Sequence, residues 1–276
     1  MNKVYDILID KVCDLIEEKK MLPWQCPYQS VNPTNFITKK SYRGFNKLYL
    51  SFLRFESQYF VSFKQARQLG GSIKKGQNGF PVIYYNFIEK KKESGKVESI
   101  PFAKYSTVFN LDQCENIDTS KIESIKNETL EFDPVEAAEN IINNYKTIPA
   151  IEYDKSFQSC YIPSKDVVRI QNKEYFSGVN EFYSTIFHEL VHSTGSKKRL
   201  NRFLEGTSYS KAEYSKEGLI AEIGAFTLCR EAQIETTLDN STAYIQSWIK
   251  VLKNNTSWLF SAASKAEKAT NYILNK

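Results

Sequence analysis

The order of apolar and polar residues in the first part of the chain predicts three helices. Apolar residues recur at the spacing of one helix face over residues 3–20, with charged residues between them. Residues 45–55 repeat this pattern. Ser62 has the side chain of an N-cap and opens a third, short helix that we expect to end near Gly70.

The segments that follow predict a hairpin and a linker. Residues 80–88 and 102–109 are rich in aromatic and β-branched residues, as strands are, and a charged turn separates them. The sequence then becomes polar and poor in aromatic residues, and we place a linker at 119–133. The first domain is therefore expected at residues 1–118, as a small α+β unit.

The rest of the chain predicts a mainly helical domain at residues 134–276. Short segments of strand composition occur between residues 150 and 171. Helical patterns occupy about four stretches: 134–146, 178–194, 213–233 and 240–274. The expected fold class is thus α+β, with a small sheet in a helical second domain.

Several protein classes are excluded by composition. No stretch approaches the roughly 20 apolar residues that cross a bilayer, and the acidic residues near the N-terminus are unlike the apolar core of a signal peptide. The five cysteines are odd in number and widely spaced, without a Cys-x-x-Cys pair, which argues against a disulfide framework or a thiolate zinc site. We therefore expect a cytoplasmic protein with no membrane partner.

The positive charge of the chain lies in its first half. The formal net charge is +5, and residues 132–276 carry equal numbers of acidic and basic residues. Within residues 19–96 there are 15 lysines and arginines against three glutamates, a net charge of +12, together with 15 aromatic residues. Cations that follow phosphates and rings that stack on bases are what a single-strand binder needs, although most of the rings must also form the core. The residues that we expect to contact nucleic acid are Trp24, Lys39, Lys40, Tyr42, Arg43, Asn46, Lys47, Lys64, Arg67, Lys74 and Lys75.

A metal motif occupies the second half. The chain contains two histidines, and both lie in His188-Glu189-Leu190-Val191-His192. On a helix, this spacing places both imidazoles on one face, where they can bind one Zn²⁺, and directs Glu189 toward a metal-bound water as general base. We predict His188 and His192 as metal ligands and Glu189 as the catalytic residue, with Zn²⁺ as the metal and Mn²⁺ as an alternative.

The third ligand must come from another residue type, because no histidine remains. Glu222 is an acid within an apolar run, where an unpaired carboxylate would be costly, so it is the first candidate. Glu217, at the start of the same predicted helix, is the alternative. The acid that does not bind the metal is expected to orient a ligating histidine.

Ordered blocks along nearly the whole chain carry a family resemblance. These blocks are Leu22–Trp24, Ser41–Asn46, Leu69–Gly71, Lys75–Gly76, Val108–Asn110, Tyr161–Asp166, Phe182–Gly195, Tyr214–Glu217, Ala221–Ala225 and Tyr244–Leu252. The chain resembles ArdC-type antirestriction proteins of conjugative plasmids and other mobile elements. In that family an N-terminal single-stranded-DNA-binding domain precedes a zincin-like metallopeptidase domain. The family usually has Glu-Glu-Leu where this chain has Glu217-Gly218-Leu219, which leaves the choice of third ligand open.

The resemblance implies a function in two parts. We expect an antirestriction-type protein that binds single-stranded DNA and carries a zinc-dependent peptidase-like domain, with a protein substrate as a second partner. A non-enzymatic protein that coats single-stranded DNA and holds a structural metal is the alternative. A dedicated peptidase with incidental basic charge is a third, weaker hypothesis.

Overall fold

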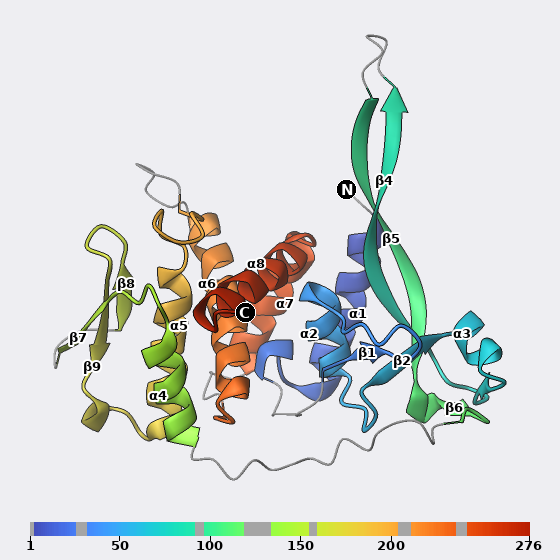
Figure 1. Cartoon of the computed structure of the whole chain (residues 1–276), viewed down its shortest axis with the longest axis horizontal. Helices are drawn as coiled ribbons and strands as arrows, with labels where there is room; N and C mark the ends of the chain where they lie inside the picture. The colour runs from blue at the N-terminus through green and yellow to red at the C-terminus, as the bar shows by residue number, and fades with distance from the viewer. Residues whose placement is uncertain are drawn as a thin grey trace. The chain divides into compact units, whose positions relative to one another are not determined.

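The computed structural model shows two compact units (Figure 1). The structure describes seven ranges: 3–25, 32–91, 97–118, 134–154, 159–203, 211–235 and 242–276. Unit 1 is formed mainly by residues 31–127 with the first 19 residues, and unit 2 mainly by residues 128–248 and 257–276. Two short segments cross this division: Lys20–Ser30 belongs to unit 2, and Ile249–Thr256 belongs to unit 1. The linker predicted at 119–133 lies outside the described residues.

Unit 1 combines helices with a four-stranded sheet, in the strand order β1-β2-β5-β4. Its elements are α1 (Lys3–Lys19), β1 (Thr34–Asn35), α2 (Gly44–Phe52), β2 (Tyr59–Ser62), α3 (Phe63–Gln68), β3 (Ser72–Ile73), β4 (Phe80–Lys91), β5 (Val97–Asn110), η2 (Leu111–Gln113) and β6 (Cys114–Glu115). The predicted N-cap is present: Ser62 accepts a hydrogen bond from the Gln65 backbone, and the Gln65 side chain accepts one in return. This capping box fixes the start of α3.

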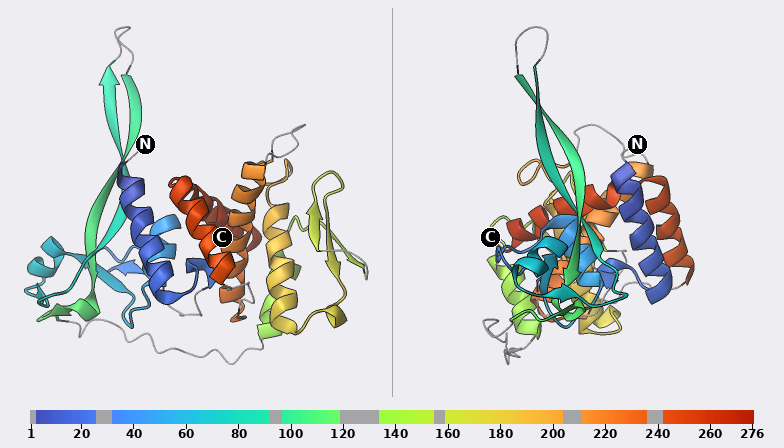
Figure 2. Two further views of the ribbon diagram at one scale, coloured as in Figure 1. Left: turned by 180° about the vertical axis from the view of Figure 1, so that it is seen from behind. Right: turned by 90° about the vertical axis from the view of Figure 1, so that its right-hand side faces the viewer.

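The predicted hairpin is present and is longer than the sequence suggested. Strands β4 and β5 pair from Phe80↔Val108 to Lys91↔Val97, and they form a long twisted ribbon (Figure 2). Asn46 on α2 binds the first part of β4. Its side-chain amide donates a hydrogen bond to the Ile83 carbonyl at 2.6 Å and accepts one from the Ile83 N–H at 2.9 Å.

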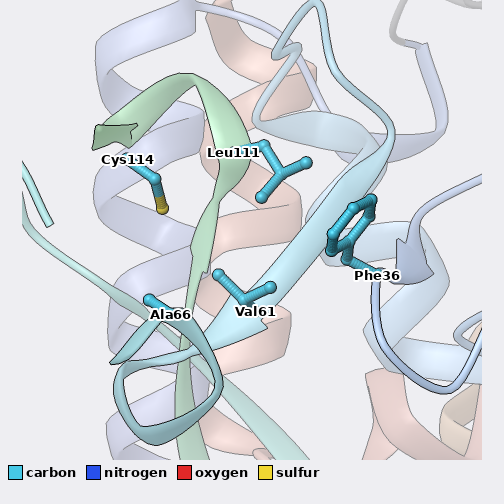
Figure 3. Packing of buried hydrophobic residues seen from close by; sticks show 5 residues of the cluster. All are labelled: Phe36, Val61, Ala66, Leu111 and Cys114. Atoms are coloured by element: carbon cyan, nitrogen blue, oxygen red, sulfur yellow. The ribbon is translucent and has the colours of Figure 1, made fainter. Parts of the chain in front are cut away.

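A small apolar cluster anchors α3 to the sheet (Figure 3). Its buried members come from the turn after β1, from β2, α3, η2 and β6, and are Phe36, Val61, Ala66, Leu111 and Cys114. Since Ala66 is fully buried, α3 has one face in the core and its other faces in solvent.

Unit 2 packs helices beside a three-stranded sheet of order β7-β9-β8. Its elements are η1 (Pro23–Gln25), α4 (Pro134–Asn144), β7 (Ala150–Asp154), β8 (Cys160–Ile162), β9 (Val167–Gln171), η3 (Lys173–Tyr175), α5 (Val179–Ser193), α6 (Lys211–Glu231), the first part of α7 (Thr242–Asn254) and α8 (Trp258–Ile273). Helix α5 is apolar along most of its length and packs against α6. A Cβ atom on Gly224 of α6 would lie 2.7 Å from the Val191 side chain of α5, so this glycine permits the close approach of the two helices.

Together, these elements give the α+β fold that the sequence predicted. Among the helices that the structure describes, none is long and apolar enough to cross a membrane.

Candidate metal centre and nucleic-acid surface

The two histidines meet on one face of α5, as the motif predicted. Their Nε2 atoms are 3.2 Å apart, and both side chains are largely buried. Two ligands at about 2.0–2.1 Å from one tetrahedral ion would be about 3.3 Å apart, so the pair fits a metal ion. Burial and the neighbouring His192 lower the pKa of His188 to about 3, which keeps this imidazole in the neutral form that metal binding requires.

Glu217 approaches His192 from the opposite edge of the ring. Its Oε1 lies 3.6 Å from His192 Nδ1, and Arg202 donates to the same carboxylate at 2.7 Å. Burial would raise the pKa of Glu217, but the neighbouring His192 and the hydrogen bonds from Arg202 outweigh it and lower the pKa. A carboxylate on the Nδ1 side of the ring can orient it and leave Nε2 for a metal, which is the role predicted for one of the two acids; for Glu217 this role stays a prediction.

Glu222 is not brought to the histidines, contrary to the first expectation. Trp24 donates its indole N–H to Glu222 Oε2 at 2.6 Å, and the Tyr244 hydroxyl donates to Oε1. The reason is helical geometry: Glu217 and Glu222 are five positions apart, so their side chains point about 140° apart around α6. Burial raises the pKa of Glu222 despite these two hydrogen bonds. Among the residues that the structure describes, no group of three metal-binding side chains forms.

Glu189 lies on the same helix and contacts the sheet. The backbone N–H of Tyr161, in edge strand β8, donates to Glu189 Oε2 at 2.7 Å. Burial raises the pKa of this carboxyl, although His192 and the Tyr161 N–H act in the opposite direction. A bound divalent ion would supply an acidic water, and a carboxylate of raised pKa beside it can hold and pass on a proton. Sequence reasoning missed this contact, because a backbone donor is not visible in a side-chain motif.

Two arginines hold the end of the motif helix. Arg202 donates to the Val191 carbonyl at 3.0 Å, and Arg199 donates to the Ser193 carbonyl at 3.1 Å. Carbonyls in the last turn of a helix have no partner within it, and cations at this end are favourable. Gly195 follows with a Cβ position only 2.6 Å from the Phe203 ring, so it is needed for close packing rather than for a left-handed backbone.

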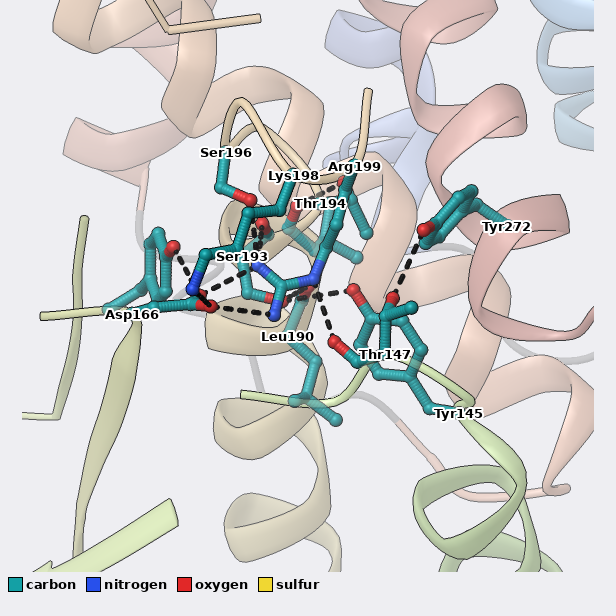
Figure 4. Close-up of polar contacts among 12 residues, drawn as sticks. Tyr145, Thr147, Asp166, Leu190, Ser193, Thr194, Ser196, Lys198, Arg199 and Tyr272 are labelled. Atoms are coloured by element: carbon teal, nitrogen blue, oxygen red, sulfur yellow. Dashed lines mark hydrogen bonds and ion pairs between the residues drawn. The ribbon is translucent and has the colours of Figure 1, made fainter. Parts of the chain in front are cut away.

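Arg199 also connects this helix end with the sheet (Figure 4). Its Nη1 and Nη2 donate to the two carboxylate oxygens of Asp166 at 2.7 and 3.3 Å, and its Nε donates to the Thr147 carbonyl at 2.8 Å. The arginine side chain is 2% exposed. The network is a buried ion pair that fixes the position of α5 within unit 2, and sequence reasoning missed it.

The structure separates the predicted nucleic-acid contacts into buried and exposed groups. Trp24 is fully buried in unit 2, and Asn46 is used by the hairpin backbone, so both predictions are wrong for these side chains. Tyr42 is partly buried, with its ring edge-on to Phe60, and Lys47 has other interactions. The remaining predicted cations are exposed: Lys39, Lys40, Arg43, Lys64, Arg67, Lys74 and Lys75.

Comparison with known proteins agrees with both parts of this description. Residues 2–109 match the family model of the N-terminal domain of anti-restriction factor ArdC, and residues 136–265 match that of a zincin-like metallopeptidase. The metal-free crystal structure of the antirestriction ArdC protein from plasmid R388 is 30% identical, with a TM-score of 0.74 over 98% of this chain and 96% of that one. The chain belongs to the ArdC family of antirestriction proteins. The Mn(II)-bound structure of the same R388 protein is 29% identical, with a TM-score of 0.75.

Other members of this similarity group are longer or uncharacterised. An Escherichia coli protein named DNA primase TraC is 30% identical over 94% of this ArdC family chain, which spans only 26% of that protein's length. The uncharacterized protein y4eC of Sinorhizobium fredii is 25% identical over 91% of this chain and 84% of its own length. The ArdC-like region therefore also occurs within much larger proteins.

Proposed function

We propose that this chain acts as an antirestriction protein of a mobile element, binding single-stranded DNA through unit 1 and a catalytic zinc ion through unit 2. The observation that carries the proposal is the likeness to R388 ArdC over both units, together with two histidine Nε2 atoms spaced for one ion. We place the protein in the cytoplasm, where its exposed Cys160 thiol would stay reduced.

For unit 2, we propose metal-assisted peptide hydrolysis. His188 and His192 would bind the ion, Glu217 would orient His192, and Glu189 would transfer the proton. Zinc suits two imidazoles, and Mn²⁺ is the alternative because the R388 protein is described with Mn(II).

The test of the metal site measures two quantities for each variant: the amount of bound metal, and the rate at which an unfolded protein such as casein is hydrolysed. His192→Ala should lose bound metal. Glu189→Gln should retain the metal and lose at least about 100-fold in hydrolysis. Hydrolysis that is unchanged in Glu189→Gln would rule out Glu189 as the base.

The second candidate is a protein that coats DNA and holds a structural metal. The Tyr161–Glu189 hydrogen bond favours it, because that bond gives Glu189 a structural use without any reaction. This alternative predicts that the full-length protein binds metal but hydrolyses no casein, and that Glu189→Ala lowers its stability because the Tyr161 N–H loses its acceptor.

For unit 1, we propose that the exposed cations follow the phosphates of a single strand. Two cation–ring contacts support this. Lys39 Nζ lies 4.1 Å from the centroid of the Phe36 ring, and the Arg67 guanidinium lies 5.6 Å from the centroid of the Phe63 ring. Cations and aromatic rings therefore alternate in this unit. The test is fluorescence anisotropy of a labelled single strand at several salt concentrations, with duplex as control. Affinity that falls steeply with salt and favours the single strand supports the proposal; no binding at low salt contradicts it.

A further inference from the structure

Phe63 is exposed to an unusual degree for a side chain without a polar atom. It is 55% exposed, more than any other large apolar side chain that the structure describes. A single exposed apolar side chain is ordinary on a protein surface, so the exposure of Phe63 counts only together with the fixed backbone and the cations around the ring.

The backbone that carries the ring is also fixed, because it belongs to a capped helix and not to a loop. Phe63 is the first residue of α3, directly after the Ser62–Gln65 capping box. Gln65 additionally exchanges hydrogen bonds with Asn35, at 3.1 and 3.4 Å, and Ala66 anchors the helix in the apolar cluster. A rigid backbone presents the ring to a ligand with little loss of entropy.

Cations without acidic partners accompany the ring. The chain contains no acidic residue between Glu56 and Glu89, whereas Lys64, Arg67, Lys74 and Lys75 all lie in that stretch. Arg67 is one helical turn after Phe63, with its guanidinium 5.6 Å from the ring centroid. Strand β3 packs against α3 and leads directly into the two lysines at 74 and 75. None of these four cations forms an ion pair within the described part of the chain, although Lys74 Nζ donates to the Asp112 carbonyl at 2.8 Å and the acidic Glu115 of β6 pairs with Ser72 of β3.

We propose that Phe63 is a base-stacking residue for single-stranded DNA, with Arg67 on the same platform and Lys64, Lys74 and Lys75 along the phosphates. The inference rests on the proposed DNA binding by unit 1 and assigns it a location. A flat ring beside a planar guanidinium accepts any base, and an excess of positive charge favours a polyanion over an apolar protein surface. Stacking requires unpaired bases, so this residue would also give the preference for single strands over duplex.

The experiment measures the affinity of the full-length protein for a labelled oligothymidine longer than about 16 nucleotides. Phe63→Ala and Phe63→Leu should each weaken binding about 5- to 100-fold, with the slope of affinity against salt unchanged. Arg67→Ala and Lys64→Ala should instead flatten that slope by about 0.7 each. Tyr175→Ala, which removes a ring of similar exposure in unit 2, should bind like wild type.

A further variant detects stacking directly. All three tryptophans of the chain belong to unit 2, so Phe63→Trp adds a single reporter to unit 1. Its affinity should stay near wild type, and its emission should be quenched by the oligonucleotide. If wild type binds the single strand but Phe63→Ala and Phe63→Leu bind equally well, the inference is wrong and the proposed function stands. If wild type itself does not bind, both fail. Circular dichroism of each variant checks that the fold is retained.

Discussion

Replacing Arg199 with methionine should destabilise unit 2 strongly. The side chain is 2% exposed and donates to both oxygens of Asp166 and to the carbonyls of Thr147 and Ser193. Methionine can occupy much of the volume but leaves a carboxylate and two carbonyls without this donor. Breaking a fully buried ion pair by removing one partner costs about 3–5 kcal/mol. Since Asp166 is 19% exposed and keeps hydrogen bonds from Tyr161 and Lys198, we expect a loss at the lower end of this range, which is still a large part of the stability of an ordinary domain.

Lys198 provides a matched control from the neighbouring position. Its Nζ lies 3.2 Å from the same Asp166 carboxylate, but the side chain is 75% exposed. An exposed ion pair of this kind contributes less than about 1 kcal/mol, so Lys198→Met should be nearly neutral. The two variants remove one positive charge each, and they differ mainly in burial and in the number of hydrogen bonds.

Acid should reduce the contribution of this network in a defined range of pH. Burial would raise the pKa of Asp166, but hydrogen bonds from Arg199, Tyr161 and Lys198 lower it from 3.8 to about 2. A lowered pKa stabilises the folded state above the unfolded value, and this contribution is lost as the pH falls from about 4 toward 2. The difference corresponds to about 2 kcal/mol at neutral pH, which Asp166→Asn should lose.

The assay is urea denaturation followed by tryptophan fluorescence, which reports unit 2 because Trp24, Trp248 and Trp258 all belong to it. At pH 7 the midpoint of Arg199→Met should fall well below that of Lys198→Met. Equal midpoints for these two variants would refute the reasoning that burial makes this pair important. A wild-type advantage over Asp166→Asn that persists undiminished at pH 2 would refute the lowered pKa.

Three further substitutions test single contacts. Glu222→Ala should lower the free energy of unfolding by about 1–3 kcal/mol in the same fluorescence assay, because the buried Trp24 indole N–H loses its acceptor. The bound metal, measured by elemental analysis, should stay unchanged. Gly224→Ala should destabilise unit 2 by about 1–3 kcal/mol, because its Cβ would clash with the Val191 side chain. An unchanged urea midpoint would instead show that α5 and α6 can move apart at no cost. Asn46→Ala should speed amide exchange at the base of the hairpin, as mass spectrometry would detect, and should leave the salt dependence of DNA binding unaltered.

Local patterns predicted the helices and the hairpin because their signals are short-range. Ser62 and Gln65 are three residues apart and cap α3 as such a pair should. His188 and His192 are one turn apart, and helical geometry alone brings their Nε2 atoms together. Exposed aromatic residues were harder to predict, since aromatic residues serve core and surface alike. Phe63 was not among the predicted contacts, although it is the most exposed large apolar residue that the structure describes.

Trp24 and Glu222 show where sequence reasoning fails and why. Glu222 was correctly expected to need a polar partner but was assigned to the metal, and Trp24 was assigned to DNA. They bond to each other across 198 positions of sequence, and no periodic pattern can signal such a pair. The Glu222 carboxylate does have polar donors, as the cost of an unpaired charge in an apolar run predicts. These donors are the Trp24 indole and the Tyr244 hydroxyl instead of a metal ion.

This pairing also changes how the two functions can be studied separately. A cut at the predicted linker would leave residues 134–276 without Lys20–Ser30, a segment that belongs to unit 2. Such a fragment lacks the buried Trp24 ring, which packs edge-on against Trp248 at 5.5 Å, and it leaves the Glu222 carboxyl with one donor fewer. An inactive fragment would therefore reflect a missing part of the core as readily as a missing activity. Point substitutions in the full-length chain avoid this confusion, because Glu189→Gln and Phe63→Ala each change one unit and leave the other as its control.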